Sequence, residues 1–88
     1  MGLVVIKVRV YLTRSCPYCQ MALRLLDKKG ADVEQIWVDR RPELRDEMTR
    51  ITGRHTVPQI FIGDHHVGGY AELAELDMED ELEPMLNA

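Results

Sequence analysis

Residues 3–12 carry apolar side chains at alternate positions, and most of these are Val, Ile or Leu. A period of two predicts a strand with one buried face. The residues on that face are Ile6, Val8, Val10 and Leu12. Residues 33–38 and 59–62, which are rich in Val and Ile, predict two further strands. Residues 65–67 are expected to pair with the latter across a turn at Gly63–Asp64.

Two helices are predicted between these strands. Pro17 suits the first turn of a helix because its missing N–H is not needed there, and the basic pair before Gly30 is typical of a helix end. The side chains expected to face the core from this helix are Met21, Ala22, Leu25 and Leu26. The second helix is expected to begin at Pro42 and to end at Gly53. Its apolar residues recur with helical spacing at Leu44, Met48 and Ile51.

The last part of the chain, after Gly68–Gly69, is acidic and amphipathic. It predicts one or two helices that break near Asp77 and end by Pro84, with apolar positions at Leu73, Leu76, Met78, Leu82 and Leu86.

The order of elements is therefore β-α-β-α-β-β-α. A strand–helix–strand start implies a right-handed parallel crossover, and the hairpin adds two antiparallel strands. We expect an α/β protein with a mixed four-stranded sheet flanked by helices, which is the minimal thioredoxin fold. At 88 residues the chain has room for one domain, residues 1–88.

Charge is unevenly distributed along the chain, whose net charge is −4. Residues 7–54 hold all 11 Lys and Arg against seven acids, whereas residues 55–88 hold eight acids and no Lys or Arg. The acidic excess argues against nucleic acid as a partner. The acidic end is expected to be a solvated face, and the basic part is either solvated too or a rim for an anionic substrate. No apolar run approaches the length of a membrane span, and no secretory signal is visible, so we expect no membrane partner and a cytoplasmic protein.

Both cysteines of the chain lie in one tetrapeptide, Cys16-Pro17-Tyr18-Cys19. Two cysteines so close together constrain little of the unfolded chain when bridged, which favours a chemical over a structural role. Cys16 falls where the first strand gives way to the first helix, and unpaired N–H groups at a helix start stabilise a thiolate. Cys19 is one helical turn further on and within reach. We therefore predict that Cys16 attacks and Cys19 resolves.

Two other interpretations of the cysteine pair fit the sequence less well. Structural zinc usually has four ligands, and the three histidines lack the usual spacing, so no metal site is predicted. Two incidental core cysteines would not explain a proline at the start of a helix that follows a strand. Trp37 is expected to pack, and His65 and His66 are expected to lie on the hairpin surface.

Three sequence blocks together resemble the glutaredoxin family, in its small dithiol type. They are Tyr11 with Cys16-Pro17-Tyr18-Cys19, then Thr56-Val57-Pro58-Gln59-Ile60-Phe61-Ile62, then Gly68-Gly69-Tyr70. The resemblance runs from Val8 to about Leu86. It implies a cis peptide bond before Pro58, facing the cysteines, and a thiol–disulfide oxidoreductase with glutathione as co-substrate and no tightly bound cofactor.

The resemblance also implies a glutathione site. The residues assigned to it are Tyr18, Arg45, Thr56, Val57, Pro58, Gly69, Tyr70, Ala71 and Glu72. Thr56, Val57 and Pro58 would contact the cysteinyl part, and amides of Gly69, Tyr70 and Ala71 the γ-glutamyl carboxylate. Arg45 would bind the glycine carboxylate, and Glu72 the ammonium group. The chain departs from many members in having Thr13 three residues before Cys16, and Ala71 after Tyr70.

The partners expected from the resemblance are glutathione, glutathionylated proteins and protein disulfides, with ribonucleotide reductase as one candidate, and the protein is expected to be a monomer. Two alternatives stay open. One is a donor recycled by a thioredoxin reductase instead of glutathione. The other is a carrier of a [2Fe–2S] cluster held between two copies, although such carriers of the single-cysteine type have Gly-Phe-Ser after the nucleophile and this chain has Pro17.

Overall fold

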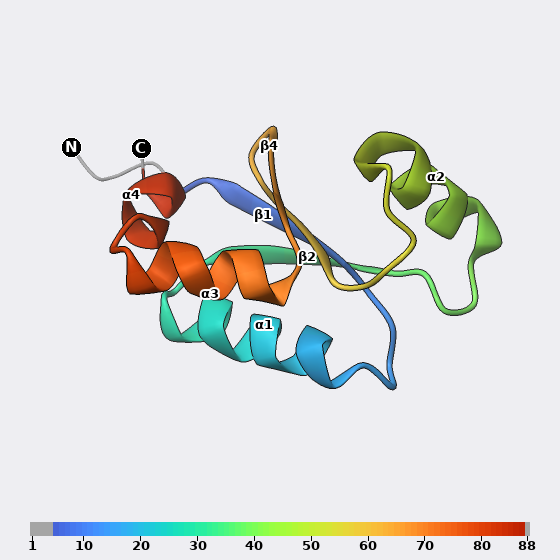
Figure 1. Ribbon diagram of the computed structural model, residues 1–88, viewed down its shortest axis with the longest axis horizontal. Coiled ribbons are helices and arrows are strands. Elements are labelled where there is room, and N and C mark those ends of the chain that lie inside the picture. Colours follow the sequence, from blue (N-terminus) through green and yellow to red (C-terminus); the bar gives the residue numbers. More distant parts are fainter. Residues whose placement is uncertain (1–4, 88) are drawn as a thin grey trace.

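A four-stranded sheet organises the computed structural model, which describes residues 5–87 (Figure 1). The strand order is β2-β1-β3-β4. β1 (Lys7–Leu12) pairs in parallel with β2 (Asp32–Trp37) and antiparallel with β3 (Gln59–Ile62), which pairs antiparallel with β4 (His65–Gly68). The mixed sheet of the thioredoxin fold is therefore confirmed.

Four helices cover the two faces of this sheet. They are α1 (Pro17–Lys28), α2 (Pro42–Thr52), α3 (Tyr70–Met78) and α4 (Leu82–Leu86). α1 and α3 lie side by side on one face with α4 beyond them, and α2 lies on the other face (Figure 1). The amino ends of α1 and α3 point toward the same side of the molecule, and this brings the cysteine pair and the glycine pair of the sequence close together.

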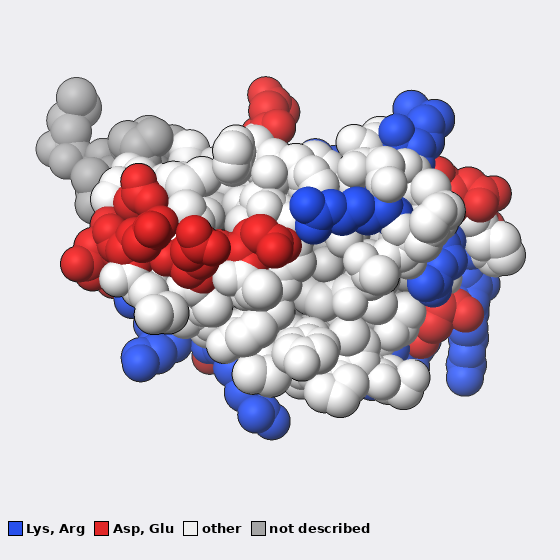
Figure 2. All heavy atoms as spheres, viewed as in Figure 1, with Lys and Arg blue, Asp and Glu red and all other residues white. Residues whose placement is uncertain are grey.

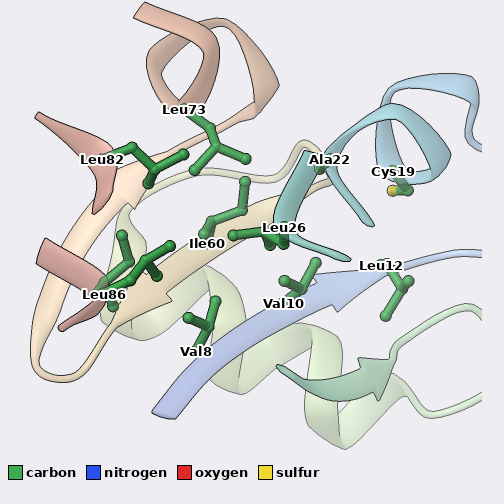
Figure 3. Packing of buried hydrophobic residues seen from close by; sticks show 11 residues of the cluster. Val8, Val10, Leu12, Cys19, Ala22, Leu26, Ile60, Leu73, Leu82 and Leu86 are labelled. Carbon is green, nitrogen blue, oxygen red and sulfur yellow. The ribbon is translucent and has the colours of Figure 1, made fainter. Parts of the chain in front are cut away.

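The core is split by the sheet into two clusters. The larger cluster joins the predicted face of β1 to α1, α3, α4 and β3, and it is drawn in Figure 3. Its fully buried members include Val8, Val10, Leu12, Cys19, Ala22, Leu26, Ile60, Leu73, Leu82 and Leu86. The smaller cluster, under α2, contains Tyr11, Val38, Met48 and Phe61. Tyr11 is buried because α2 covers the second face of β1, a contact that the alternation in β1 does not predict.

Three apolar residues expected in the core are exposed. Met21 is 39% exposed, Ile51 38% and Met78 84%. Met78 is the last residue of α3. These three predictions were wrong because helical spacing identifies the apolar side of a helix but not how far its partner extends.

The end of the chain differs from expectation at Pro84. The break after Asp77 is confirmed, since Asp80 has a positive φ of 57° and α4 follows. α4 continues through Pro84 and ends at Leu86, because a proline in the first turn lacks an N–H that would have no acceptor there anyway. At the other end, residues 3 and 4 of the predicted first strand lie outside the described residues. Among those described, no helix is long and apolar enough to span a membrane.

Lys29, just past the end of α1, links that helix to the end of the chain. Its Nζ lies 2.9 Å from Asp77 Oδ1 and 2.9 Å from Glu83 Oε1, and these carboxylates raise the pKa of Lys29. The contact ties the far end of α1 to α3 and α4, while the amino ends of α1 and α3 form the site.

Candidate active site

Cys16 is the residue that caps the amino end of α1. Its backbone is extended, and Pro17 follows as the first helical residue. The Cys19 backbone N–H donates to Cys16 Sγ at 3.1 Å, so the sulfur takes the place of a capping side-chain oxygen. The hydrogen bond from this N–H and the positive end of the helix dipole both favour a negative charge on the Cys16 sulfur.

Cys19 has the opposite environment one turn further along α1. Its side chain is fully buried in the larger core cluster (Figure 3). Burial, assisted by the neighbouring Cys16, raises the pKa of Cys19 to about 12. The Cys19 thiol therefore keeps its proton at neutral pH.

The loop before β3 faces the cysteine pair. The Val57–Pro58 peptide bond is cis, as the family resemblance implied. The Val57 carbonyl oxygen lies 3.7 Å from Cys16 Sγ. A substrate sulfur that bonds to Cys16 would therefore have the backbone of Val57 beside it.

A cleft of about 270 Å³ opens from this loop toward the start of α3. Its lining residues are Tyr18, Arg54, Thr56, Val57, Pro58, Gln59, Gly69, Tyr70, Ala71 and Glu72. Tyr18 is 61% exposed, and its ring stacks on that of Tyr70 with centroids 6.2 Å apart. The structure thus brings together, in one cleft, eight of the nine residues assigned to glutathione binding.

Arg45 is the assigned residue that does not line the cleft. It lies on α2, where its Nη2 donates to the His55 carbonyl oxygen at 3.0 Å. Its assignment to the glycine carboxylate stays a prediction, and the contact with His55 keeps it close to the loop that leads to Thr56.

Arg54 and Gln59 line the cleft but were not assigned from the sequence. Arg54 lies two residues before Thr56, and this proximity to an assigned block was a usable signal. The sequence predicts Gln59 as the first residue of a strand and as part of the second block that resembles glutaredoxins, but with no role in the cleft. A polar residue in a short apolar run could have indicated a buried hydrogen-bonding role.

The Glu72 side chain caps the start of α3. Glu72 Oε1 accepts the Gly69 N–H at 2.6 Å and lies 3.4 Å from Arg54 Nη1. The Gly69 hydrogen bond, together with Arg54, lowers the pKa of Glu72. Glu72 thus already accepts the Gly69 N–H. The next two amides, of Tyr70 and Ala71, have no intrahelical acceptors because they lie in the first turn of the helix. These two N–H groups are available to an anion in the cleft.

Charge around the cleft is divided. Acidic side chains gather over α3 and α4, whereas the surface near the amino ends of α1 and α3 carries few charges (Figure 2). The expected solvated acidic face is thus present. Within residues 5–87, no group of three or more His, Cys, Asp or Glu could hold a metal ion.

A second cleft, of about 710 Å³, lies between β2 and α2, and no cysteine lines it. Trp37 borders it, packed against the larger core cluster and with the Arg14 guanidinium 5.1 Å from its ring centroid. Arg14 also pairs with Asp39 at 2.9 Å. The expected packing role of Trp37 is confirmed.

Known proteins resemble this chain over most of its length. The glutaredoxin family model matches residues 8–67. A glutaredoxin of Pseudomonas aeruginosa is 47% identical over 79 residues, which are 90% of this chain and 94% of that protein. Glutaredoxin 3 of Escherichia coli strain K12 is 42% identical over 90% of this chain and 95% of its own.

Solved structures agree with these matches. The holo form of glutaredoxin C1 from Populus tremula x tremuloides superimposes with a TM-score of 0.85 at 32% identity, covering 93% of this chain and 77% of that one. A buckwheat glutaredoxin–glutathione complex has a TM-score of 0.83 at 32% identity, covering 90% and 74%. Fold and cysteine pair define a thiol oxidoreductase with the thioredoxin fold. Within that class, the chain belongs to the glutaredoxin family.

Proposed function

We propose that the protein is a glutathione-dependent thiol–disulfide oxidoreductase that reduces glutathione mixed disulfides and protein disulfides through Cys16 and Cys19. The observation that carries this proposal is the position of Cys16 Sγ, which caps α1 and lies 3.7 Å from the Val57 carbonyl oxygen at the cleft. The similar buckwheat protein, solved as a complex with glutathione, supports glutathione as the reducing thiol.

Glutathione would bind in the cleft as an extended peptide. Its cysteinyl unit would pair with the Val57 backbone like a short added strand, with Thr56 and Pro58 beside it and Tyr18 next to the disulfide. Its γ-glutamyl carboxylate would accept N–H groups at the start of α3, from Tyr70 and Ala71 next to Gly69, and its ammonium would approach Glu72. Arg45 is assigned to the glycine carboxylate. Arg54, which lines the cleft, is a second positively charged side chain near Thr56.

Reduction of a mixed disulfide needs Cys16 alone. Its thiolate attacks the glutathione sulfur, a new disulfide forms between Cys16 and glutathione, and the partner protein leaves as a thiolate that takes up a proton. A second glutathione, as thiolate, then attacks the bound glutathione sulfur. Oxidised glutathione leaves, and the Cys16 thiolate is restored.

Reduction of a protein disulfide also needs Cys19. Cys16 attacks one sulfur of the substrate, and the resulting mixed disulfide is broken when Cys19 loses its proton and attacks Cys16 Sγ. The substrate leaves with both sulfurs reduced, and the enzyme holds a Cys16–Cys19 disulfide. Two glutathione molecules reduce that disulfide and become oxidised glutathione.

Substitution of each cysteine separates the two reactions. Cys16→Ser is expected to lower mixed-disulfide reductase activity at least about a thousandfold, because the nucleophile is removed. Cys19→Ser is expected to keep at least about half of that activity and to lose the reduction of protein disulfides. The assay follows glutathione-dependent reduction of a glutathionylated peptide and of a disulfide protein. Wild-type activity in Cys16→Ser would refute the proposed function.

Glutaredoxin reduction potentials of roughly −200 to −230 mV suit reduction by a cytosolic glutathione pool. We therefore propose that the enzyme acts in the cytoplasm with glutathione as co-substrate. We also propose that it is a monomer and has no tightly bound cofactor. Its protein partners would be glutathionylated proteins and protein disulfides, with ribonucleotide reductase as a candidate. Size-exclusion chromatography with light scattering tests the monomer.

A further inference from the structure

Gln59, the first residue of β3, is the one buried polar side chain within residues 5–87, at 1% exposure. Both ends of its amide are hydrogen-bonded. Nε2 donates to the Thr56 carbonyl oxygen at 3.0 Å and to Thr56 Oγ1 at 3.3 Å, and Oε1 lies 2.7 Å from His66 Nε2. A buried amide is tolerated when its donors and acceptors are all used, as they are here.

His66, on β4, is held in place by the sheet. It lies opposite Phe61 and diagonal to Gln59 across the β3–β4 pair, where the register shifts between Ile60 and Phe61. Its ring stacks on that of Phe61 with centroids 4.9 Å apart, and the Arg9 guanidinium lies 4.7 Å from the centroid of the same Phe61 ring. His66 does lie on the hairpin, but it is only partly exposed, because Phe61 opposite and Gln59 on the diagonal partly cover it.

The Thr56 carbonyl oxygen fixes the direction of the Gln59 amide, because it can only accept a hydrogen bond. With Oε1 turned toward His66, the bond requires hydrogen on His66 Nε2, and the ring then donates. A reversed amide would direct Gln59 Oε1 at the Thr56 carbonyl oxygen, and two acceptors would meet. With the amide directed in this way, His66 Nε2–H donates to Oε1 and holds Gln59 in the orientation that bonds Thr56.

The charged and titratable groups that act on His66 are Arg54, His65 and Glu72. Burial first, then Arg54 and His65, lower the pKa of His66, while Glu72 opposes them. The Nε2–H donor is present both in the neutral tautomer that bonds Gln59 and in the protonated ring, so the contact with Gln59 does not depend on titration.

Thr56 and Val57 line the cleft, and the Val57 carbonyl oxygen lies 3.7 Å from Cys16 Sγ. From these contacts we infer that His66 and Gln59 are positioning residues, which hold Thr56–Val57 at the spacing that the peptide part of a disulfide substrate requires. The inference rests on the proposed function, since it names residues that prepare the same site. Neither residue touches the reacting sulfurs, so both act on substrate affinity and not on the chemical step.

The test compares substitutions that separate stacking from hydrogen bonding. His66→Phe keeps an aromatic ring against Phe61 and loses the donor, whereas His66→Gln keeps a donor at similar reach. His66→Phe is expected to raise the KM for a glutathionylated peptide roughly fivefold, the effect of one lost hydrogen bond, with kcat within about twofold. His66→Gln is expected to restore KM to within about twofold, and His65→Phe, the exposed neighbour, to leave both unchanged.

A second measurement needs no substrate. The backbone amide resonances of Thr56 and Val57 are expected to shift in His66→Phe and to return toward their wild-type positions in His66→Gln. If His66→Phe does not fold, Gln59→Met, which removes the amide at similar volume, is expected to raise KM by the same factor.

Three results would overturn the inference: unchanged KM and amide shifts in folded His66→Phe, His66→Gln behaving like His66→Phe, or a loss confined to kcat. Failure of the wild-type protein to reduce the glutathionylated peptide would instead refute the proposed function, and the amide shifts would still decide the role of His66.

Discussion

Cys16 and Cys19 are three residues apart, yet their surroundings differ in every respect that matters for thiol chemistry. Cys16 is partly exposed and accepts an N–H at the start of α1, while Cys19 is fully buried. The first environment stabilises a thiolate and the second a thiol. The proposed division into attacking and resolving sulfur rests on this difference across one turn of helix.

The buried thiol makes a prediction about reactivity. In Cys16→Ser, we expect Cys19 to react with iodoacetamide at pH 8 at least about a hundredfold more slowly in the folded than in the urea-unfolded protein. In the wild-type protein, burial first and then the hydrogen bond to Cys16 raise the pKa of Cys19 to about 12 from its ordinary value of 9.0. Burial, the larger cause, remains in Cys16→Ser, so little Cys19 thiolate is expected at pH 8. Mass spectrometry of timed samples gives both rates. Equal rates would mean that the Cys19 thiol is open to solvent.

Gly68 is the residue at which a side chain would do most damage near the cleft. Its φ is +118°, and an added Cβ would lie 2.6 Å from Glu72 Oε1 and 3.2 Å from Arg54 Nη1. We expect Gly68→Ala to lower the free energy of unfolding by about 2–3 kcal/mol through backbone strain and displacement of Glu72.

Gly30→Ala is the matched control for Gly68→Ala. Gly30 also has a positive φ, +71°, but nothing lies within 4 Å of an added Cβ. Its cost is expected to be about 1 kcal/mol, the strain of the left-handed conformation alone. Urea denaturation of both variants measures the difference, and equal losses would show that the crowding at Gly68 has no effect.

At the scale of elements, the start of α3 combines helix capping with the candidate carboxylate site. The Glu72 carboxylate occupies the Gly69 N–H and faces Arg54, which leaves the next amides of α3 directed at the cleft. Because Glu72 already occupies the Gly69 N–H, an anion would reach the start of α3 from the cleft, where the next amides lie.

The cap at Glu72 predicts a pH dependence of stability. The pKa of Glu72 is lowered in the folded protein, so its carboxylate stabilises the fold above the unfolded value, near 4.5, and this contribution is lost as pH falls through the folded value. Glu72→Gln is therefore expected to lower the free energy of unfolding by about 0.5 kcal/mol at pH 7. The difference should shrink below pH 4.5.

Thermal unfolding of wild type and Glu72→Gln between pH 3 and pH 7 provides the measurement. Glu75→Gln, one turn further along the same helix and exposed, is the control and should show little difference at any pH. A Glu72 difference that grows as pH falls would contradict the capping role.

At the scale of the whole molecule, the sheet lies between two core clusters that share Val57 as a neighbour. α2 packs on one side of the sheet, and α1, α3 and α4 pack on the other (Figure 1). The site draws on α1, the loop before β3 and the start of α3, so its geometry depends on the complete sheet.

We therefore propose that residues 1–88 unfold as one domain. In urea under reducing conditions, the fluorescence of Trp37 on edge strand β2 and the far-ultraviolet circular dichroism are expected to give the same midpoint, in one transition. The free energy of unfolding should fall with urea concentration by about 1 kcal/mol/M, near the low end for small proteins, because little surface is buried in a chain this short. Separate midpoints would show that α2 and its cluster unfold independently.

Local patterns were sufficient for most elements of this protein. The alternation over β1, the proline at the start of α1 and the glycine at the end of α2 identify features that depend on neighbouring residues only, and the structure has them where they were predicted. The position of Cys16 at a helix start belongs to the same class. Resemblance to glutaredoxins, and not local pattern, pointed to the cis bond before Pro58.

Only the tertiary structure decided which side chains meet across the sheet and how far each is covered. Met21 and Ile51 were misplaced, and Tyr11, Gln59 and His66 were not recognised as buried or partly buried partners. Burial, hydrogen bonding between strands and the exclusion of Arg45 from the cleft depend on residues distant in sequence. Periodicity describes a single element, whereas these contacts arise where two elements meet.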